Sequence, residues 1–315
     1  MFITTSNFGA ETEGAGSQYQ RKLLTYLYAK NKGLVYVDID ENLYLQGDDV
    51  AFSMDEIKTL WNKAFSFLRE EKVSQKITDK YKVVDFQVVL RYFSILNTRE
   101  RDILLKKAAE EFRKSVNQAN FKTNYEKNKF HIALHLRAKA KTDITHFKYF
   151  SYPWQYFNVD YGLPDNNPGY YAKLFSSEIN RISQKTKQAV MLHLHTMASD
   201  DDLKYLLSLI DPDIEIRIIR QRISVSAVID FVFADVFIGS HSSFSWLALL
   251  LRTGPSYLRG GFRHFVPSHT SYIGEVLYEK GEWLKNFGRY INRLISYAYF
   301  YPQYYYQLLT SRLYF

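Results

Sequence analysis

The sequence predicts an α/β protein of two domains, each built on a parallel β-sheet covered by helices. The first observation is length, because a domain of about 150 residues is typical and the chain has 315. The second is an alternation of apolar strand-like and helix-like segments after residue 129, which is typical of an open parallel sheet. The third is composition, since 46% hydrophobic and 23% charged residues indicate a folded globular chain.

The composition excludes several classes of protein. The chain has no cysteine, which rules out a disulfide framework, a thiolate zinc site and a cysteine nucleophile. No apolar run approaches the roughly 20 residues that a membrane-spanning helix needs. The first residues lack a basic region followed by an apolar one, so we expect no signal peptide and a cytoplasmic location.

The net charge of +8 favours an anionic partner. Residues 236–274 contain no Asp or Glu but hold three Arg and three His, which indicates a local anion site more than a spread basic face. The charge alone is compatible with a phosphorylated small molecule, a nucleic acid or a membrane surface as partner. It is also compatible with charged side chains that only keep the protein soluble. Because no nucleic-acid recognition motif is present, we expect no nucleic acid as partner.

The first predicted unit is a βαβ unit with a glycine-rich loop. Its parts are a strand at 1–6, a loop at 7–18, a helix at 19–30 and a strand at 34–38. Gly14 and Gly16 would let the loop backbone approach a ligand, and the following helix N-terminus favours negative charge. The loop does not read G-x-G-x-x-G, so it does not indicate a dinucleotide site. A flexible connection is the alternative interpretation.

Three further segments complete the first predicted domain. They are a helix at 53–70 capped by Ser53, a strand or buried helix at 81–95, and a charged amphipathic helix at 97–120 with Thr98 as its cap. A polar connection follows at 121–129. We therefore predict domains at 1–128 and 129–290, followed by an aromatic segment at 291–315 that packs back on them.

The second predicted domain alternates strands and helices. The expected strands are 130–137, 189–195, 214–219 and 235–238, and the expected helices are 168–185, 200–209, 224–233 and 243–252. In such sheets ligands bind at the carboxyl ends of strands, where the strand order reverses. Polar residues at these strand ends are therefore the candidate ligand positions.

Two strand ends carry histidines. His135 and Arg137 point to one face, and the guanidinium of Arg137 suits phosphate oxygens. A surface arginine beside a core-edge histidine is the alternative. His193 and His195 also share a face, as a metal pair would, but spacing fixes no third ligand. The acidic residues 200–202 that follow are more simply the start of a helix.

A third strand end leads into a serine-rich helix start. Residues 239–245 read Gly-Ser-His-Ser-Ser-Phe-Ser, and hydroxyls and backbone amides at a helix N-terminus suit a phosphate or diphosphate. A serine nucleophile is the rival interpretation, but the sequence lacks Gly-x-Ser-x-Gly. An ordinary helix cap is the simplest alternative.

These motifs, in this order, resemble the fucosyltransferase superfamily, meaning its α1,2-, α1,6- and protein O-fucosyltransferase branches. The resemblance rests on the glycine-rich loop ending in Gln18, on His135-x-Arg137, and on residues 235–245, and it covers roughly residues 1–260. It implies a GT-B-like fold, with two Rossmann-type domains facing a cleft. It also implies inverting transfer of L-fucose from GDP-fucose to a hydroxyl of a glycan acceptor, with no metal or other cofactor.

The resemblance also implies roles for donor-binding residues. Arg137 would hold the donor β-phosphate, and His135 would lie near the guanine and ribose. Asp230 would contact the base. Further donor contacts are implied for Asp201, Asp202, Ser242, Ser243 and Phe244.

The catalytic base is implied less directly. One branch carries a Glu in its N-terminal loop, which makes Glu13 the first candidate, and Asp143 is the second. The family often has Arg-Arg-x-Asp after the histidine, whereas Ala138 and Lys139 follow Arg137 here. This departure puts the sugar and the base in question.

Other functions stay open at this point. They are transfer from a UDP-sugar or another donor, noncatalytic binding of a nucleotide or carbohydrate, and nucleic-acid binding. The segment 297–315 has nine aromatic residues and no acid. It would pack on the domains, mediate a homo-oligomer, or lie on a membrane surface.

Overall fold

The computed structural model describes residues 1–5, 15–38, 53–69, 81–123, 125–136, 168–220, 224–240, 242–259 and 265–273. All of them belong to one compact unit, Met1–Ile273. The predicted boundary at 128/129 falls between two sheets of this unit and stays a prediction, and the segment 291–315 lies outside the described residues. None of the described helices is long and apolar enough to span a membrane.

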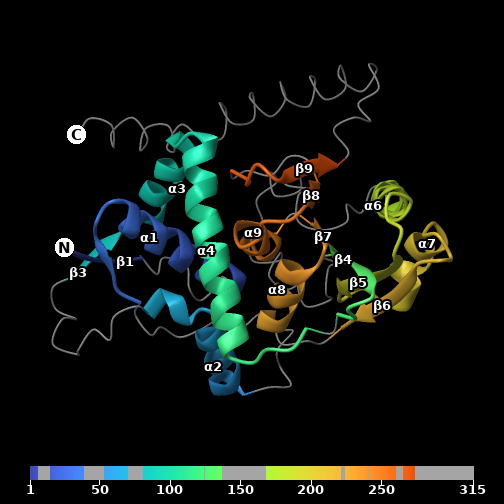
Figure 1. Ribbon diagram of the computed structural model, residues 1–315, viewed down its shortest axis with the longest axis horizontal. Helices are drawn as coiled ribbons and strands as arrows, with labels where there is room; N and C mark the ends of the chain where they lie inside the picture. Colours follow the sequence, from blue (N-terminus) through green and yellow to red (C-terminus); the bar gives the residue numbers. More distant parts are fainter. Residues whose placement is uncertain are drawn as a thin grey trace, which may run out of the picture. The chain divides into compact units, whose positions relative to one another are not determined.

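The smaller sheet is parallel and has the strand order β2-β1-β3. Figure 1 labels two of its strands, β1 and β3, near α1. Its elements are β1 (Phe2–Thr5), α1 (Ala15–Asn31), β2 (Val35–Tyr36) and β3 (Tyr81–Val84). Phe2 pairs with Val35, which confirms the predicted βαβ unit. Helix α1 begins earlier than predicted and ends at Asn31, and Gly33 follows it with a φ of 64°, in the left-handed region. The N–H of Leu34 donates to the carbonyl of Ala29, which closes a Schellman motif.

Three capped helices follow β2 in the sequence and precede the larger sheet. They are α2 (Met54–Ala64), followed by the 3-10 turn η2 (Ser66–Arg69), then α3 (Phe86–Ile95) and α4 (Thr98–Gln118). Ser53 and Glu56 form a capping box on α2, as predicted for Ser53. The segment predicted as either strand or helix is both, because Asp85 accepts from the N–H of Gln87 and starts α3 after β3. The predicted cap Thr98 is wrong, since Asn97 caps α4.

The larger sheet has six parallel strands in the order β6-β5-β4-β7-β8-β9. Its elements are β4 (Lys129–Leu136), α6 (Pro168–Ser183), β5 (Ala189–Thr196), α7 (Asp200–Ser208), β6 (Glu215–Ile219), α8 (Ser224–Phe233), β7 (Val236–Gly239), α9 (Ser243–Leu250), β8 (Ser256–Arg259) and β9 (Thr270–Ile273). The two parallel sheets confirm the predicted α/β class, while β8 and β9 are additional to the predicted strands. From β4 the chain builds outward through β5 and β6, then continues with β7 on the other side of β4. The strand order therefore reverses between β4 and β7.

Alternating side chains divide the six-stranded sheet into two faces. Ile132 and Leu134 of β4 belong to a core with apolar residues of α6 and α7. Ala133 lies on the opposite face and packs in a core that includes residues of α8 and α9. Because His131 and His135 alternate in step with Ala133, they share the face that α8 and α9 cover.

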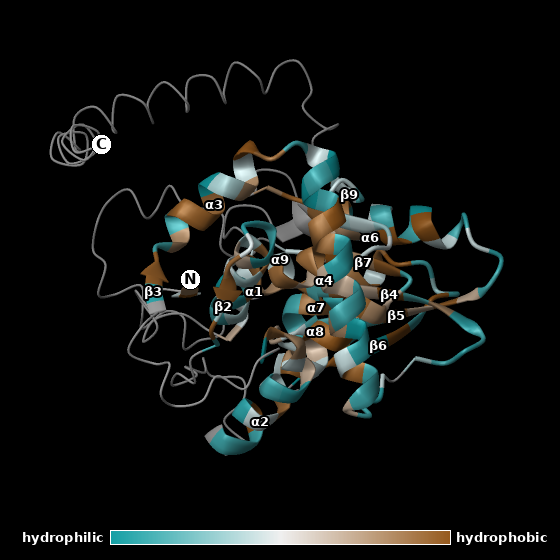
Figure 2. Cartoon of the chain, turned by 60° about the vertical axis from the view of Figure 1, so that its left-hand side comes forward, coloured by the Kyte–Doolittle hydropathy of each residue, from teal (hydrophilic) through white to brown (hydrophobic). Residues whose placement is uncertain are grey.

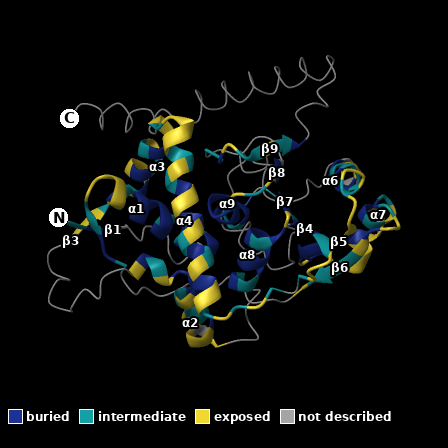
Figure 3. Cartoon of the chain, viewed as in Figure 1, coloured by how far each residue is buried: buried dark blue, intermediate teal, exposed yellow. Residues whose placement is uncertain are grey.

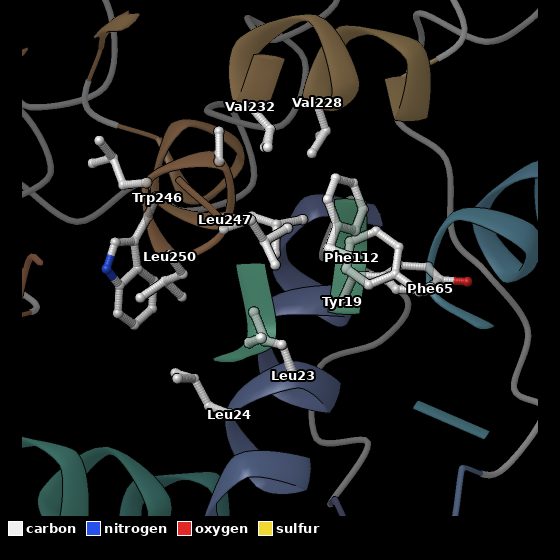
Figure 4. Packing of buried hydrophobic residues seen from close by; sticks show 14 of the residues in the cluster. Tyr19, Leu23, Leu24, Phe65, Phe112, Val228, Val232, Trp246, Leu247 and Leu250 are labelled. Atoms are coloured by element: carbon white, nitrogen blue, oxygen red, sulfur yellow. The ribbon is translucent and has the colours of Figure 1, made fainter. Parts of the chain in front are cut away.

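Helix α9 is the centre of the larger core. After its serine-containing first turn it is apolar and fully buried from Trp246 to Leu250, whereas α4 combines a buried side with an exposed, charged side (Figures 2 and 3). Figure 4 shows the residues that meet there from both parts of the unit: Tyr19, Leu23, Leu24, Phe65, Phe112, Val228, Val232, Trp246, Leu247 and Leu250. The core therefore joins α1 of the smaller sheet to α8 and α9 of the larger one.

Candidate anion-binding site

The candidate site lies where the strand order of the larger sheet reverses. β4 ends just after His135, and β7 ends at Gly239 on the neighbouring strand. Since parallel strands end at one edge of the sheet, this edge is where ligands of such folds bind. A Cβ at Gly239 would lie 3.1 Å from the Cβ of Ser245 and from the ring of Phe237, so a side chain there would need these neighbours to shift by a few tenths of an ångström.

Serine side chains organise the first turn of α9. Ser242 caps the helix, and its Oγ accepts from the N–H of Ser245 at 3.0 Å. Ser242 is 3% exposed and Ser245 is fully buried, while Ser243 is half-buried. The sequence prediction of a serine-rich helix start after a strand is therefore confirmed in its structure, and its ligand stays a prediction.

His135 is held against this helix start. Its Nδ1 lies 2.7 Å from the Oγ of Ser245, a hydrogen bond between residues 110 positions apart. Its ring stacks on Phe231 of α8, with centroids 5.3 Å apart, and meets the edge of Phe244 at 5.6 Å. The imidazole at the end of β4 is thus fixed in orientation by α8 and α9 together.

The N-terminus of α1 reaches the same place. A Cβ built on Gly16 would lie 2.8 Å from Cδ2 and 3.0 Å from Cα of Phe244, so only glycine permits this approach. Neither α1 nor α9 has an acidic residue in its first turn. Two positive helix ends therefore meet beside His135 without a neutralising carboxylate in either first turn, which favours an anionic ligand. Gln18 lies half-buried on α1, one turn from its start.

Behind this edge lies a buried acid–histidine pair. His195, at the end of β5, is the register partner of His135. Its Nε2 lies 3.6 Å from Oδ2 of Asp230 on α8, and the residues are 4% and 1% exposed. The ring of Phe231 meets His195 edge-on at 4.7 Å, so one aromatic ring contacts both histidines.

The other histidine pair has a structural environment. His193 Nε2 lies 2.9 Å from Nδ1 of His131, whose Nε2 lies 2.8 Å from the carbonyl of Glu126. A carbonyl only accepts, so His131 carries its proton on Nε2. Tyr125 stacks on His131 at 4.5 Å. His193 and His195 thus have different partners, and no cluster of three metal-ligating side chains occurs among the residues described.

Two predicted site residues have partners within helix α7, and others are not described. Ser199 caps α7 and forms a capping box with Asp202. The hydrogen bonds from Ser199 lower the pKa of the Asp202 carboxyl. Asp201 pairs with Lys204 at 2.7 Å on the surface. These positions fit the start of a helix, and a contact of either residue with a nucleoside stays a prediction. Glu13, Gly14, Arg137 and Asp143 lie outside the described residues.

Sequence reasoning missed three residues of the site. Ser245 positions His135, Phe231 contacts both histidines, and His195 was considered only as a metal ligand. The serine spacing 242-x-x-245 at a helix start is the one sequence signal that pointed toward Ser245. The other two contacts depend on strand order.

Comparisons with known proteins give only distant likenesses. No protein-family model matches the sequence, and no curated protein does. Among solved structures, POFUT1 in complex with GDP is 11% identical, over 82% of this chain and 99% of that chain, with a TM-score of 0.39. POFUT1 in complex with GDP-fucose is 12% identical, over 87% and 97%, with a TM-score of 0.38. The E. coli heptosyltransferase WaaC with ADP is 10% identical, over 86% and 92%, with a TM-score of 0.38.

Proposed function

We propose that this chain is a glycosyltransferase that moves a sugar from a nucleoside diphosphate to a hydroxyl of a glycan. The donor that we infer is GDP-fucose, and the mechanism that we infer is inverting and metal-independent. The proposal is supported by the ordered motifs of the sequence and by one observation above all. Gly16 brings the start of α1 against Phe244 at the start of α9, beside His135, at the edge where the strand order reverses.

The geometry suits a diphosphate for electrostatic reasons. Backbone N–H groups at a helix N-terminus, together with the positive helix dipole, stabilise phosphate oxygens. Ser242 and Ser243 start one helix and Gly16 lies in the first turn of the other. Arg137 follows the last residue of β4 directly in the sequence, and we assign its guanidinium to the β-phosphate.

The reaction needs two further functions. A base must deprotonate the acceptor hydroxyl as it attacks the anomeric carbon from the face opposite the diphosphate, and we assign this role to Glu13, with Asp143 as the second candidate. Cationic and dipolar groups must stabilise the departing GDP, which we assign to Arg137 and the helix ends. The attacking oxygen forms the new glycosidic bond as the bond to the β-phosphate oxygen breaks.

Titration with nucleoside diphosphates tests the proposal first. We expect GDP to raise the melting temperature more than UDP or ADP at equal concentration. We expect transfer from GDP-fucose to continue in EDTA. Stabilisation by UDP instead of GDP would indicate that the donor is a UDP-sugar and not GDP-fucose. Tight GDP binding without transfer or hydrolysis of any nucleotide sugar would favour a noncatalytic binding protein.

Two variants then separate binding from catalysis. Arg137→Ala is expected to lose GDP binding and turnover together, whereas Glu13→Gln is expected to keep GDP affinity and lose turnover. Arg99→Ala and Glu110→Gln are matched controls, because both residues are exposed on α4. Full activity of Arg137→Ala would contradict the assignment of the phosphate site.

A further inference from the structure

We propose that Arg220 recognises the base of the nucleotide donor, by donating hydrogen bonds from its guanidinium to O6 and N7 of guanine. The inference rests on the proposed function, and it names the residue that makes the site select GDP over ADP. Asp230, which the family resemblance assigns to the base, stays a separate prediction.

Arg220 follows the last residue of β6, at the edge of the larger sheet that carries the candidate anion site. His135 of β4 is the register partner of His195, and His195 is the register partner of Ile219. Arg220 therefore leaves the sheet level with the end of β4, two strands away. Since neighbouring strands lie about 4.8 Å apart, this separation is about 10 Å, which the ribose and base of a nucleotide can span.

Two contacts with the turn after β5 hold the guanidinium of Arg220 in one orientation. Its Nε donates to the carbonyl of Ala198 at 3.0 Å, and its Nη2 donates to Oδ1 of Asp200 at 2.7 Å. Both contacts use the edge of the guanidinium that Nε and Nη2 form. The edge formed by Nη1 and Nη2 keeps donors for a ligand, because the group has five N–H donors in all. The side chain is 35% exposed, so a ligand can reach it.

The charges along the sheet edge give the nucleotide a direction. The first turns of α1 and α9 contain no acidic residue, which favours the phosphates at that end. The first turn of α7, next to Arg220, contains Asp200, Asp201 and Asp202, which disfavours an anion there. With the phosphates at α1 and α9, the base therefore extends toward β6.

The ion pair of Arg220 with Asp200 suits a neutral ligand group. The carboxylate lies 2.7 Å from Nη2 and offsets the charge of the guanidinium, so the pair offers hydrogen-bond donors with little net charge. A second phosphate gains little from such a pair, whereas the polar edge of a base gains two hydrogen bonds of fixed geometry. Among the side chains that the structure describes at the strand ends of this edge, Arg220 is the only arginine or lysine.

The donors of Arg220 match guanine better than adenine. Guanine presents two adjacent acceptors, O6 and N7, whereas adenine presents the N6 amino donor beside N7, so a fork of donors meets a donor there. Met197 belongs to the same turn as the two anchors and is 38% exposed. Its apolar side chain provides a surface for the face of the base.

The test compares the affinities of the full chain for GDP, ADP and 7-deaza-GDP, measured by titration calorimetry. The third ligand lacks the N7 acceptor but keeps O6 and the diphosphate. The wild type is expected to bind GDP about tenfold more tightly than ADP. It is expected to bind GDP about fivefold more tightly than 7-deaza-GDP, because one hydrogen bond is lost.

The variants separate the planar fork of Arg220 from its charge. Arg220→Ala is expected to reduce the preference for GDP over ADP about tenfold and to remove the difference between GDP and 7-deaza-GDP. Arg220→Lys is expected to behave in the same way, since lysine keeps the charge but lacks the planar fork. Arg217→Ala is the matched control, because Arg217 lies on the same strand and pairs with Glu126 at 3.5 Å. It is expected to keep both wild-type ratios.

Three outcomes overturn the role of Arg220 and leave the proposed function intact. They are an unchanged GDP/ADP ratio in Arg220→Ala, equal binding of GDP and 7-deaza-GDP by the wild type, and a full preference for GDP in Arg220→Lys. If Arg220→Ala does not fold, Arg220→Lys decides in its place. Absence of binding of every nucleoside diphosphate by the wild type contradicts the proposed function itself, and the role in base recognition falls with it.

Discussion

Gly16 lies so close to Phe244 that any side chain at position 16 would overlap the phenyl ring and the backbone of α9. This contact is what joins the glycine-rich start of α1 to the serine-rich start of α9. Two motifs more than 200 residues apart in the sequence thereby share one place in the fold. The first prediction follows from this contact.

Gly16→Ala is expected to lower the free energy of unfolding by about 1–3 kcal/mol and to weaken GDP binding, because the two helix starts must move apart. Urea denaturation and GDP titration measure the two effects. Gly33→Ala is the control, since its φ of 64° makes alanine costly there without any contact to the site. Equal GDP affinity in both variants would show that the contact is structural only.

Removal of the cap of α9 should have a similar double effect. Ser242→Ala leaves the N–H of Ser245 without its acceptor, so we expect a loss of about 1 kcal/mol of stability together with weaker GDP binding. Ser53→Ala removes the cap of α2 and should cost about the same stability while leaving the affinity unchanged. An unchanged affinity in Ser242→Ala would argue against a diphosphate at this helix start.

Arg252 is predicted to stabilise the fold through its buried guanidinium. The group is 1% exposed and donates to the carbonyls of Phe231, Ala234, Asp235 and Pro255 and to the hydroxyl of Ser256. Burial lowers its pKa to about 10. Arg252→Ala removes all of these hydrogen bonds from a buried site and is expected to cost about 3 kcal/mol or more. A melting temperature of Arg252→Ala equal to that of the surface control Arg99→Ala would contradict this role.

The stability of the protein should fall in mild acid because of His269. Burial, followed by the positive charge of Arg252, lowers the pKa of His269 below its ordinary value of 6.5. As the pH falls below that value, the unfolded chain binds a proton that the folded chain does not, so the free energy of unfolding decreases. His269→Gln is expected to flatten this dependence between about pH 7 and pH 5. If the free energy of unfolding, measured by denaturation at each pH, depended on pH equally in wild type and variant, His269 would not be the cause of the loss of stability in acid.

The elements that follow from sequence are those with strong local signals. Ser53 and Glu56 mark a capping box, and the apolar runs of β4, β5 and α8 are long enough to identify. By contrast, β8 and β9 have four residues each; β8 starts directly after Pro255, and β9 starts three residues after Pro267. Asn97 and Thr98 both occur at cap positions, and the stronger preference of Asn agrees with the observed cap at Asn97.

The site itself could be predicted only in part. His135 and the serine-rich segment follow from the rule that ligands bind at strand ends. The bond from His135 to Ser245 and the pairing of His195 with Asp230 connect residues far apart in the sequence, and they depend on which strands are neighbours. No local pattern contains that information.

Hydrogen–deuterium exchange with and without GDP tests the central claim most directly. The account predicts that GDP slows exchange at the end of β4, at residues 239–245 and in the first turn of α1, with no change at the capped start of α2. Protection that appeared elsewhere while these three segments exchanged at their original rates would contradict a diphosphate site at the edge between β4 and β7.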